Sequence, residues 1–342
     1  MPVRLPLAKQ GISHNRRRPE RKRLPAWFKT TLPSGRTLEA FDETKLRVKE
    51  NRLNTVCEEA RCPNIHDCWS RGTATFMIAG QTCTRGCRFC AVDTTKTPPE
   101  LDPEEPANLA DAISRMGLSH AVITVVNRDD LEDGGAGHYR DCIMEVHDRA
   151  PMVGLELLCS DLDGNIEALE SLLQDLPLRV FAHNVECVPR LDRIVRDPRA
   201  SFSQSLRILR EAGRLRPDLK IKSSLMVGLG ETDQEVVDAM MLLRDAGVHM
   251  ITIGQYLRPT DRHLPVDRFP KPSSFMMWDR EARRMGFEAV ACGPLVRSSY
   301  RAGLLFDESE GAEPVVTRDS TGSALSSLQG LEPGTKQEGT AS

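Results

Sequence analysis

The chain lacks the features that mark membrane, secreted and nucleic-acid-binding proteins. No apolar run approaches the ~18 residues that a membrane span needs. No apolar segment follows the basic start, as it would in a secretory signal peptide. The formal net charge of −3 gives no overall attraction to nucleic acid or to a membrane surface. We therefore expect a compartment that keeps thiols reduced, where cysteines bind metals or catalyse rather than form disulfides.

The two ends of the chain differ in composition from the middle. Residues 1–25 form a basic arm, and its sparse serine and poor amphipathic pattern do not match a mitochondrial transit peptide. We expect a flexible arm and a cytoplasmic protein, with the mitochondrial matrix as the alternative. Residues 307–342 have no aromatic residue and are rich in Gly, Ser, Thr and Glu, which predicts a disordered tail.

The middle of the chain alternates short apolar runs with helical patterns. Strands are predicted at 75–79, 121–126, 153–158, 179–184, 220–230 and 250–256. Helices are predicted at 105–117 and after a capping box formed by Thr232 and Glu235. Repeated units of this kind predict an α/β fold with a parallel sheet, either open and doubly wound or a closed or partial barrel. In both folds, ligands bind at the C-terminal ends of the strands.

The cysteines are concentrated in two groups between 57 and 90. Cys83, Cys87 and Cys90 lie in CTRGCRFC, directly after the first predicted strand. Structural zinc takes four ligands, whereas three close thiolates with no obvious fourth suit a 4Fe–4S cluster with one open iron. Gly86 would let the backbone wrap around such a cluster, and Arg85 would offset its negative charge. Arg88 would offset it in the same way.

The second cysteine group is less specific by spacing alone. It contains Cys57, Cys62 and Cys68, and zinc, an iron–sulfur cluster and a redox pair all fit it. His66 lies inside this group and is interpreted as a surface residue. The remaining cysteines stand at non-ligand spacing and are interpreted as inert and buried: Cys142, Cys159, Cys187 and Cys292.

The sequence GLGET at 228–232 ends a strand and opens a helix. Gly228 and Gly230 would permit close approach of the backbone to a ligand, and a helix N-terminus favours negative groups. A plain tight turn explains the same residues equally well.

Taken together, these motifs resemble the lipoyl synthases of the radical S-adenosylmethionine superfamily. The CxxxCxxC loop is similar to the signature of the superfamily. The resemblance to lipoyl synthases covers about 25 to 303 and includes the upstream Cx4Cx5C group, GTATFMI at 72–78, VNRDDLEDGGA at 126–136, LMVGLGET at 225–232 and GPLVRSSY at 293–300. It implies a partial (β/α)6 TIM-type barrel over 73–290, with an N-terminal extension at 26–72 and a C-terminal segment at 291–306.

The resemblance also implies two 4Fe–4S clusters. Cys83, Cys87 and Cys90 would hold the first, whose open iron binds S-adenosylmethionine. An auxiliary cluster would have the ligands Cys57, Cys62, Cys68 and Ser299, the serine before the tyrosine of RSSY. A serine oxygen is a harder ligand than a thiolate and leaves iron more readily, which suits a cluster that gives up its sulfur. Glu156 and Asn184 match positions near the strand ends of the family barrel and would contact S-adenosylmethionine there, with polar packing as the alternative.

The implied reaction inserts two sulfur atoms at carbons 6 and 8 of a protein-bound octanoyl-lysine. Its implied partners are octanoylated lipoyl-domain proteins (2-oxoacid dehydrogenase acyltransferase subunits and the glycine cleavage H protein), an electron donor such as ferredoxin or flavodoxin, and an iron–sulfur carrier. The chain departs from the family pattern in LCSDLDGN at 158–165 and at Cys187, which puts substrate-side contacts in doubt. The alternatives are a biotin synthase-like enzyme, a methylthiotransferase, and a zinc-binding module whose basic arm contacts nucleic acid.

Overall fold

The computed structural model describes residues 23–28, 35–50, 55, 62, 64–70, 74–116 and 118–312. Most of the predicted basic arm, the tail beyond 312 and the predicted ligand Cys57 lie outside these ranges. Among the described residues, no helix is both long and apolar enough to cross a membrane.

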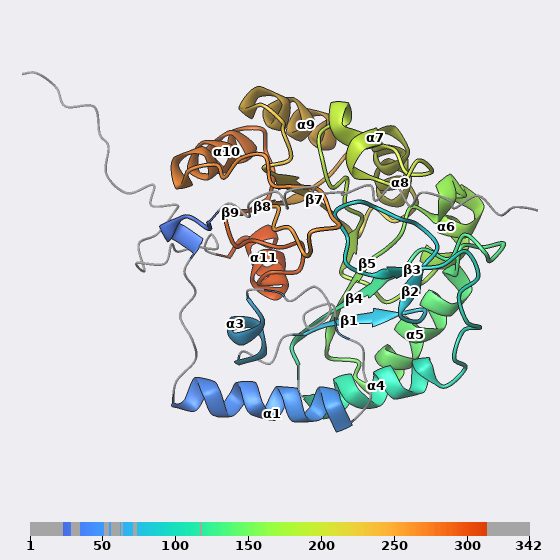
Figure 1. Cartoon of the computed structure of the whole chain (residues 1–342). Coiled ribbons are helices and arrows are strands. Elements are labelled where there is room, and N and C mark those ends of the chain that lie inside the picture. Colours follow the sequence, from blue (N-terminus) through green and yellow to red (C-terminus); the bar gives the residue numbers. More distant parts are fainter. Residues whose placement is uncertain are drawn as a thin grey trace, which may run out of the picture.

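A seven-stranded parallel sheet forms the centre of the molecule, and its strand order follows the chain (Figure 1). Its strands are β1 (Thr75–Ile78), β4 (His120–Val125), β5 (Gly154–Leu158), β6 (Val180–Ala182), β7 (Lys220–Val227), β8 (Met250–Gln255) and β9 (Ala289–Gly293). The first six coincide with the predicted strands. The strand β9 was not predicted, because its sequence AVACG consists mainly of small residues of low strand propensity. A small parallel pair, β2 (Thr82–Cys83) and β3 (Asp93–Thr94), forms after β1.

The sheet curves around an inner face and remains open. Lys222 of β7 reaches across β6 to Glu156 of β5, with 2.7 Å between Nζ and Oε1. Buried inward residues of β6, β8 and β9 pack together in the same interior: Val180, Met250, Ala289 and Ala291. In the described part of the chain, β1 and β9 are the two edges and do not pair with each other. The predicted partial barrel is therefore confirmed, with one strand more than expected.

Helices cover the outside of the barrel (Figure 1). They are α4 (Glu105–Met116), α5 (Ala136–Arg149), α6 (Ile166–Leu173), α8 (Phe202–Leu215), α9 (Asp233–Asp245) and α10 (Pro272–Arg284), with the short α7 (Asp192–Val195), η2 (Leu162–Gly164) and η3 (Pro189–Leu191) in the connections. The predicted helix at 105–117 is α4, and 117 itself lies outside the described residues. The predicted capping box starts α9, because Thr232 accepts from the Glu235 N–H and Glu235 accepts from the Thr232 N–H.

Extensions at both ends of the chain pack on the barrel and on each other. The N-terminal one contains η1 (Ala26–Phe28), α1 (Arg36–Glu50) and α3 (Ile65–Ser70), and the C-terminal one contains α11 (Ala302–Ser309). Asn64 donates to the carbonyl of Leu295 at 2.5 Å and so joins the two extensions.

Two predicted boundaries differ from the observed elements. The boundary between 290 and 291 falls inside β9, and the tail predicted from 307 begins inside α11. The end of α11 was assigned to the tail because its polar composition, including Glu308, is typical of a disordered segment. It is nevertheless buried, and it accepts from Arg283 at 2.5 Å.

Candidate active site

The three predicted cluster cysteines lie on one loop at the C-terminal edge of β1. The chain leaves β1 through a turn at Ala79 and Gly80, which have φ values of 67° and 91°. Cys83 ends β2, and its carbonyl accepts from the Thr95 N–H at 3.0 Å. Cys87 and Cys90 share a tight turn, in which the Cys90 N–H donates to the Cys87 carbonyl at 3.1 Å. All three thiols are partly buried, and the edge is the one at which parallel barrels bind ligands.

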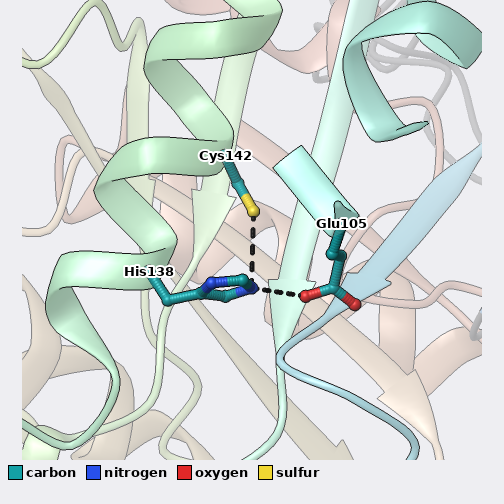
Figure 2. A group of neighbouring side chains, drawn as sticks. All are labelled: Glu105, His138 and Cys142. Atoms are coloured by element: carbon teal, nitrogen blue, oxygen red, sulfur yellow. Dashed lines mark hydrogen bonds and ion pairs between the residues drawn. The ribbon is translucent and has the colours of Figure 1, made fainter. Parts of the chain in front are cut away.

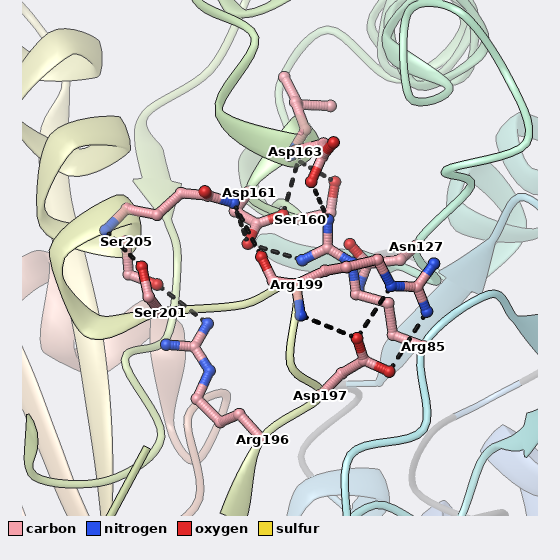
Figure 3. Close-up of polar contacts among 12 residues, drawn as sticks. Arg85, Asn127, Ser160, Asp161, Asp163, Arg196, Asp197, Arg199, Ser201 and Ser205 are labelled. Carbon is pink, nitrogen blue, oxygen red and sulfur yellow. Dashed lines mark hydrogen bonds and ion pairs between the residues drawn. The ribbon is translucent and has the colours of Figure 1, made fainter. Parts of the chain in front are cut away.

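Arg85 is the central cation of a charge network behind this loop (Figure 3). Its guanidinium donates to Asp129 and to Asp161, each at 2.7 Å, and its side chain is 1% exposed. Burial lowers the pKa of Arg85, but the two carboxylates outweigh burial and raise it. The predicted role of Arg85 needs correction, because its charge is already compensated by aspartates. Arg85 joins the loop to the ends of other strands instead.

Asp197 holds the loop from the opposite side. Its carboxylate accepts from the Gly86 N–H at 2.8 Å and from Arg199 Nε at 2.9 Å. Burial alone would raise the pKa of Asp197, yet Arg199 and the Gly86 N–H hold it at about 2. The Asp197 N–H donates to Cys87 Sγ at 3.4 Å, and the Arg85 N–H donates to Cys83 Sγ at 3.4 Å. N–H groups directed at sulfur are the contacts that iron–sulfur ligands receive in proteins.

The donor set of the loop fits an iron–sulfur cluster. Burial raises the pKa of Cys87 to about 11 and that of Cys90 to about 12, and the neighbouring thiols contribute in the same direction. The thiols of Cys87 and Cys90 are therefore costly to ionise without a cation. A bound cluster supplies that positive charge and removes the cost.

The predicted auxiliary ligand Ser299 lies at the N-terminal end of β1, opposite the end that leads to the cysteine loop. Ser299 Oγ accepts from Thr75 Oγ1 at 2.8 Å, and Thr75 is the first residue of β1. Cys62 lies within electrostatic reach of Arg297, two residues before Ser299, and burial lowers the pKa of Arg297. Cys68 is half-buried on α3. The segments of Cys62 and Ser299 thus come together.

The burial predicted for the remaining cysteines is confirmed, whereas the surface position predicted for His66 is not. Cys142, Cys159, Cys187 and Cys292 are buried, as predicted. The interpretation of His66 as a surface residue was wrong. The His66 side chain is half-buried, and its ring lies 4.6 Å from the ring of Phe41.

Glu156 and Asn184 lie in different layers of the barrel. Glu156 lies within β5, is 1% exposed and pairs with Lys222. In the described part of the chain, neither Glu156 Oε2 nor His120 Nε2 has a hydrogen-bond partner, and the two atoms are 3.6 Å apart. Asn184 is half-buried, follows β6 and hydrogen-bonds Glu186, whose pKa is raised by burial.

The glycines of GLGET have a packing role. A Cβ on Gly228 would lie 2.1 Å from Gln255 Nε2 and 2.5 Å from the Arg268 carbonyl, so no larger residue fits. The Gly228 N–H donates to Glu231 at 2.7 Å and is not free for a ligand. The tight turn explains these residues.

A polar recess of ≈ 520 Å³ borders the outer side of the cysteine loop. It is lined by Thr84, Gly86, Thr94, Thr95, Lys96, Asp129, Asp130, Asp197 and Arg199. Neither Glu156 nor Asn184 lines it. The recess therefore does not include the two predicted contacts of S-adenosylmethionine.

Two family models match the chain. Residues 77–243 match the radical SAM superfamily, and residues 7–62 match the N-terminal domain of lipoyl synthase of the radical SAM family. Among solved structures, the chain is similar to the FeFe-hydrogenase maturase HydG from Carboxydothermus hydrogenoformans, with a TM-score of 0.51, 14% identity and coverage of 79% of this chain and 69% of that one. Methylornithine synthase (PylB) has a TM-score of 0.50 and 11% identity, covering 75% of this chain and 78% of its own. At these identities, the likeness shows the fold alone.

Curated relatives are much closer in sequence. Lipoyl synthase of Thermus thermophilus is 49% identical over 306 residues, which cover 90% of this chain and 94% of the relative. Mitochondrial lipoyl synthase of Xenopus laevis is 48% identical over 296 residues, or 85% of this chain and 78% of the relative. These matches do not favour another sulfur-inserting radical enzyme. The chain belongs to the lipoyl synthase family, a family of sulfur-inserting enzymes in the radical S-adenosylmethionine superfamily.

Proposed function

We propose that this chain inserts two sulfur atoms at carbons 6 and 8 of an octanoyl-lysine on a carrier protein, with an auxiliary cluster as the sulfur source. One observation carries the proposal. The cysteine loop lies at one edge of β1, and Ser299 contacts Thr75 at the other edge of this four-residue strand. A short barrel strand therefore separates the cysteine loop from Ser299.

Cys83, Cys87 and Cys90 would hold the first 4Fe–4S cluster. When bound, this cluster supplies the electron that cleaves S-adenosylmethionine and so makes a radical able to attack an unactivated C–H bond. The protein holds the loop: Asp197 fixes the Gly86 N–H, and Arg85 ties the loop to Asp161. Holding the reacting groups in one geometry is the main contribution of protein residues to such chemistry.

Cys57, Cys62, Cys68 and Ser299 would hold the auxiliary cluster. Cys57 lies outside the described residues, whereas Cys62 and Ser299 lie on segments that meet. Thr75 donates its hydroxyl proton toward Ser299 Oγ, which stabilises negative charge on that oxygen. The same hydrogen bond orients Ser299 beside β1.

The inner face of the barrel offers two contacts for S-adenosylmethionine. Glu156 keeps Oε1 on Lys222, so Oε2 is the carboxylate oxygen through which it would contact the cofactor. Asn184 follows the C-terminal end of β6 by two residues and would contact the cofactor from there. We assign Gly228 and Gly230 to the turn rather than to the cofactor.

The proposed partners follow from the reaction. They are octanoylated lipoyl domains of 2-oxoacid dehydrogenase acyltransferase subunits and the glycine cleavage H protein, ferredoxin or flavodoxin as electron donor, and an iron–sulfur carrier that rebuilds the auxiliary cluster. The proposed compartment is the cytoplasm, with the mitochondrial matrix as the alternative, since both keep thiols reduced.

The experiment compares Ser299→Ala with Ser298→Ala, its neighbour in RSSY. Both variants are supplied with S-adenosylmethionine, a reductant and an octanoylated lipoyl domain. Ser299→Ala should still release 5′-deoxyadenosine but form no lipoyl group. Ser298→Ala should release 5′-deoxyadenosine and also form the lipoyl group. Undiminished lipoyl formation by Ser299→Ala would refute the auxiliary-ligand assignment.

A further inference from the structure

Three ligand-type side chains converge between α4 and α5, outside both cysteine groups (Figure 2). Glu105 is the first residue of α4, and His138 and Cys142 stand one turn apart on α5. His138 Nε2 lies 2.6 Å from Glu105 Oε2 and 3.8 Å from Cys142 Sγ. One ligand atom from each residue lies within 4.8 Å of the other two. The reaction proposed above does not use this cluster.

The arrangement does not match a nucleophilic triad. In such a triad, the carboxylate binds one imidazole nitrogen and the nucleophile binds the other. Here both Glu105 and Cys142 approach Nε2, so the carboxylate cannot orient the ring toward the thiol. Three donors around one point are instead the arrangement that a metal ion requires.

We propose that Glu105, His138 and Cys142 form a binding site for a borderline-soft divalent cation, with Zn²⁺ as the best match. Zinc bonds of about 2.0–2.3 Å in tetrahedral geometry place neighbouring ligand atoms roughly 3.3–3.8 Å apart. The observed separations of 2.6 and 3.8 Å, with the third at most 4.8 Å, approach that range. Side-chain rotations that move each atom by about 1 Å would complete it.

Charge and burial select the class of ion. A thiolate and a carboxylate neutralise a divalent cation, and a sulfur–nitrogen–oxygen donor set favours zinc over magnesium or calcium. The side chains of His138 and Glu105 are 8% and 17% exposed, and Cys142 is buried. Burial, and secondarily the Glu105 charge, raises the pKa of the Cys142 thiol. A cation would remove the cost of ionising that thiol.

The site connects to the turn that begins the cysteine loop. Glu105 Oε2 also accepts from the Ala79 N–H at 2.7 Å, and the Ala79 carbonyl accepts from Arg128 Nη1 at 3.4 Å. Ala79 has a φ of 67°, which an alanine rarely adopts without support. A cation on Glu105 would therefore fix α4, α5 and this turn together, which is a role separate from the reaction. With three protein ligands, Zn²⁺ would take a water molecule as its fourth ligand.

The test uses the full chain with its clusters installed, freed of loose metal with a chelator and then given Zn²⁺. Zinc and iron per chain are measured together, and zinc affinity is measured by competition with a chromogenic chelator. The variants are Cys142→Ala and His138→Gln, and the matched control is Cys292→Ala, another buried cysteine. We expect one tightly held zinc in the native chain and the control, and at least tenfold weaker binding in both variants, with iron content unchanged.

Zinc-edge X-ray absorption gives a readout that does not depend on variant folding. A shell of one sulfur with nitrogen and oxygen ligands would support the site in the native chain. No retained zinc, equal zinc in every variant, or a shell without sulfur or with several sulfurs would overturn it. Several sulfurs would mean that zinc had entered the cluster cysteines. None of these measurements depends on enzymatic turnover, so a failure of the zinc site would not count against the proposed reaction.

Discussion

Thr75 donates a hydrogen bond of 2.8 Å to Ser299 across 224 positions of sequence. Thr75 opens β1, and the chain that leaves the other end of β1 forms the loop of Cys83. This contact attaches the C-terminal segment to the strand that leads to the cysteine loop. It also gives Ser299 a partner suited to a negatively charged oxygen.

Loss of the Thr75 hydroxyl should weaken the auxiliary cluster. A hydrogen bond to a charged group contributes about 1.5–3 kcal/mol, so Thr75→Val should speed iron loss to a chelator by roughly tenfold or more. Thr75→Ser keeps the donor and should behave like the native chain. The measurement is the rate of iron release from the reconstituted protein. Equal rates for Thr75→Val and the native chain would contradict a role for this hydrogen bond.

Replacement of Arg85 should destabilise the whole fold. Arg85→Met would leave Asp161, whose side chain is 1% exposed, without its ion-pair partner. Breaking a buried ion pair costs about 3–5 kcal/mol, which urea denaturation measures as free energy of unfolding. Arg115→Met, which breaks an exposed pair with Asp111, should cost less than about 1 kcal/mol. Similar losses in the two variants would show that the Arg85 network does not stabilise the protein.

Removal of the Asp197 carboxylate should loosen the cysteine loop. Asp197→Ala frees the Gly86 N–H and removes one of the two carboxylates that pair with Arg199. Loss of these contacts is worth about 1–3 kcal/mol, so alkylation of Cys87 in the metal-free chain should quicken roughly tenfold. Asp218→Ala, which breaks an exposed pair with Arg216, serves as the control. The alkylation rate is followed by mass spectrometry, and no change in Asp197→Ala would speak against this anchoring.

His183 should make the fold sensitive to acid. Its Nδ1 lies 2.9 Å from the Cys159 carbonyl, so Nδ1 carries the proton, and Nε2 accepts from Ser205 at 2.8 Å. Burial lowers the pKa of His183 from 6.5 to about 4. Between these values the unfolded chain binds a proton that the folded chain does not, so stability falls as pH falls.

The expected loss attributable to His183 is about 2 kcal/mol between pH 7 and pH 5. His183→Asn removes the titration and should flatten this part of the pH dependence. The measurement is the free energy of unfolding across that range for both chains. Parallel curves for the native chain and His183→Asn would rule out the assigned protonation state.

Local patterns in the sequence predicted the local structure correctly. The six apolar runs became strands because each is buried on both faces, which requires continuous apolar residues. The Thr232–Glu235 capping box formed because it depends only on residues three positions apart. The strand β9 escaped prediction because its small side chains suit a crowded inner face, and small residues give no strand signal.

The partners of the site residues could not be predicted from local patterns. Arg85 lies after β1 and Asp161 lies after β5. They meet because the segments that follow parallel strands lie at the same end of the barrel. Asp197 follows α7, more than a hundred positions from Gly86, and nothing in its neighbourhood marks it. Glu156 was chosen from the family pattern, yet its pairing with Lys222 depends on the curvature of the sheet. Such contacts depend on the tertiary fold.

The most direct test of two separately held clusters is the iron and sulfide content after anaerobic reconstitution. The native chain is compared with a variant in which Cys57, Cys62 and Cys68 are all changed to Ala. We predict about eight irons in the native chain and about four in the variant. About four irons in both would mean that the upstream cysteines hold no cluster, and the proposed reaction would lose its sulfur source.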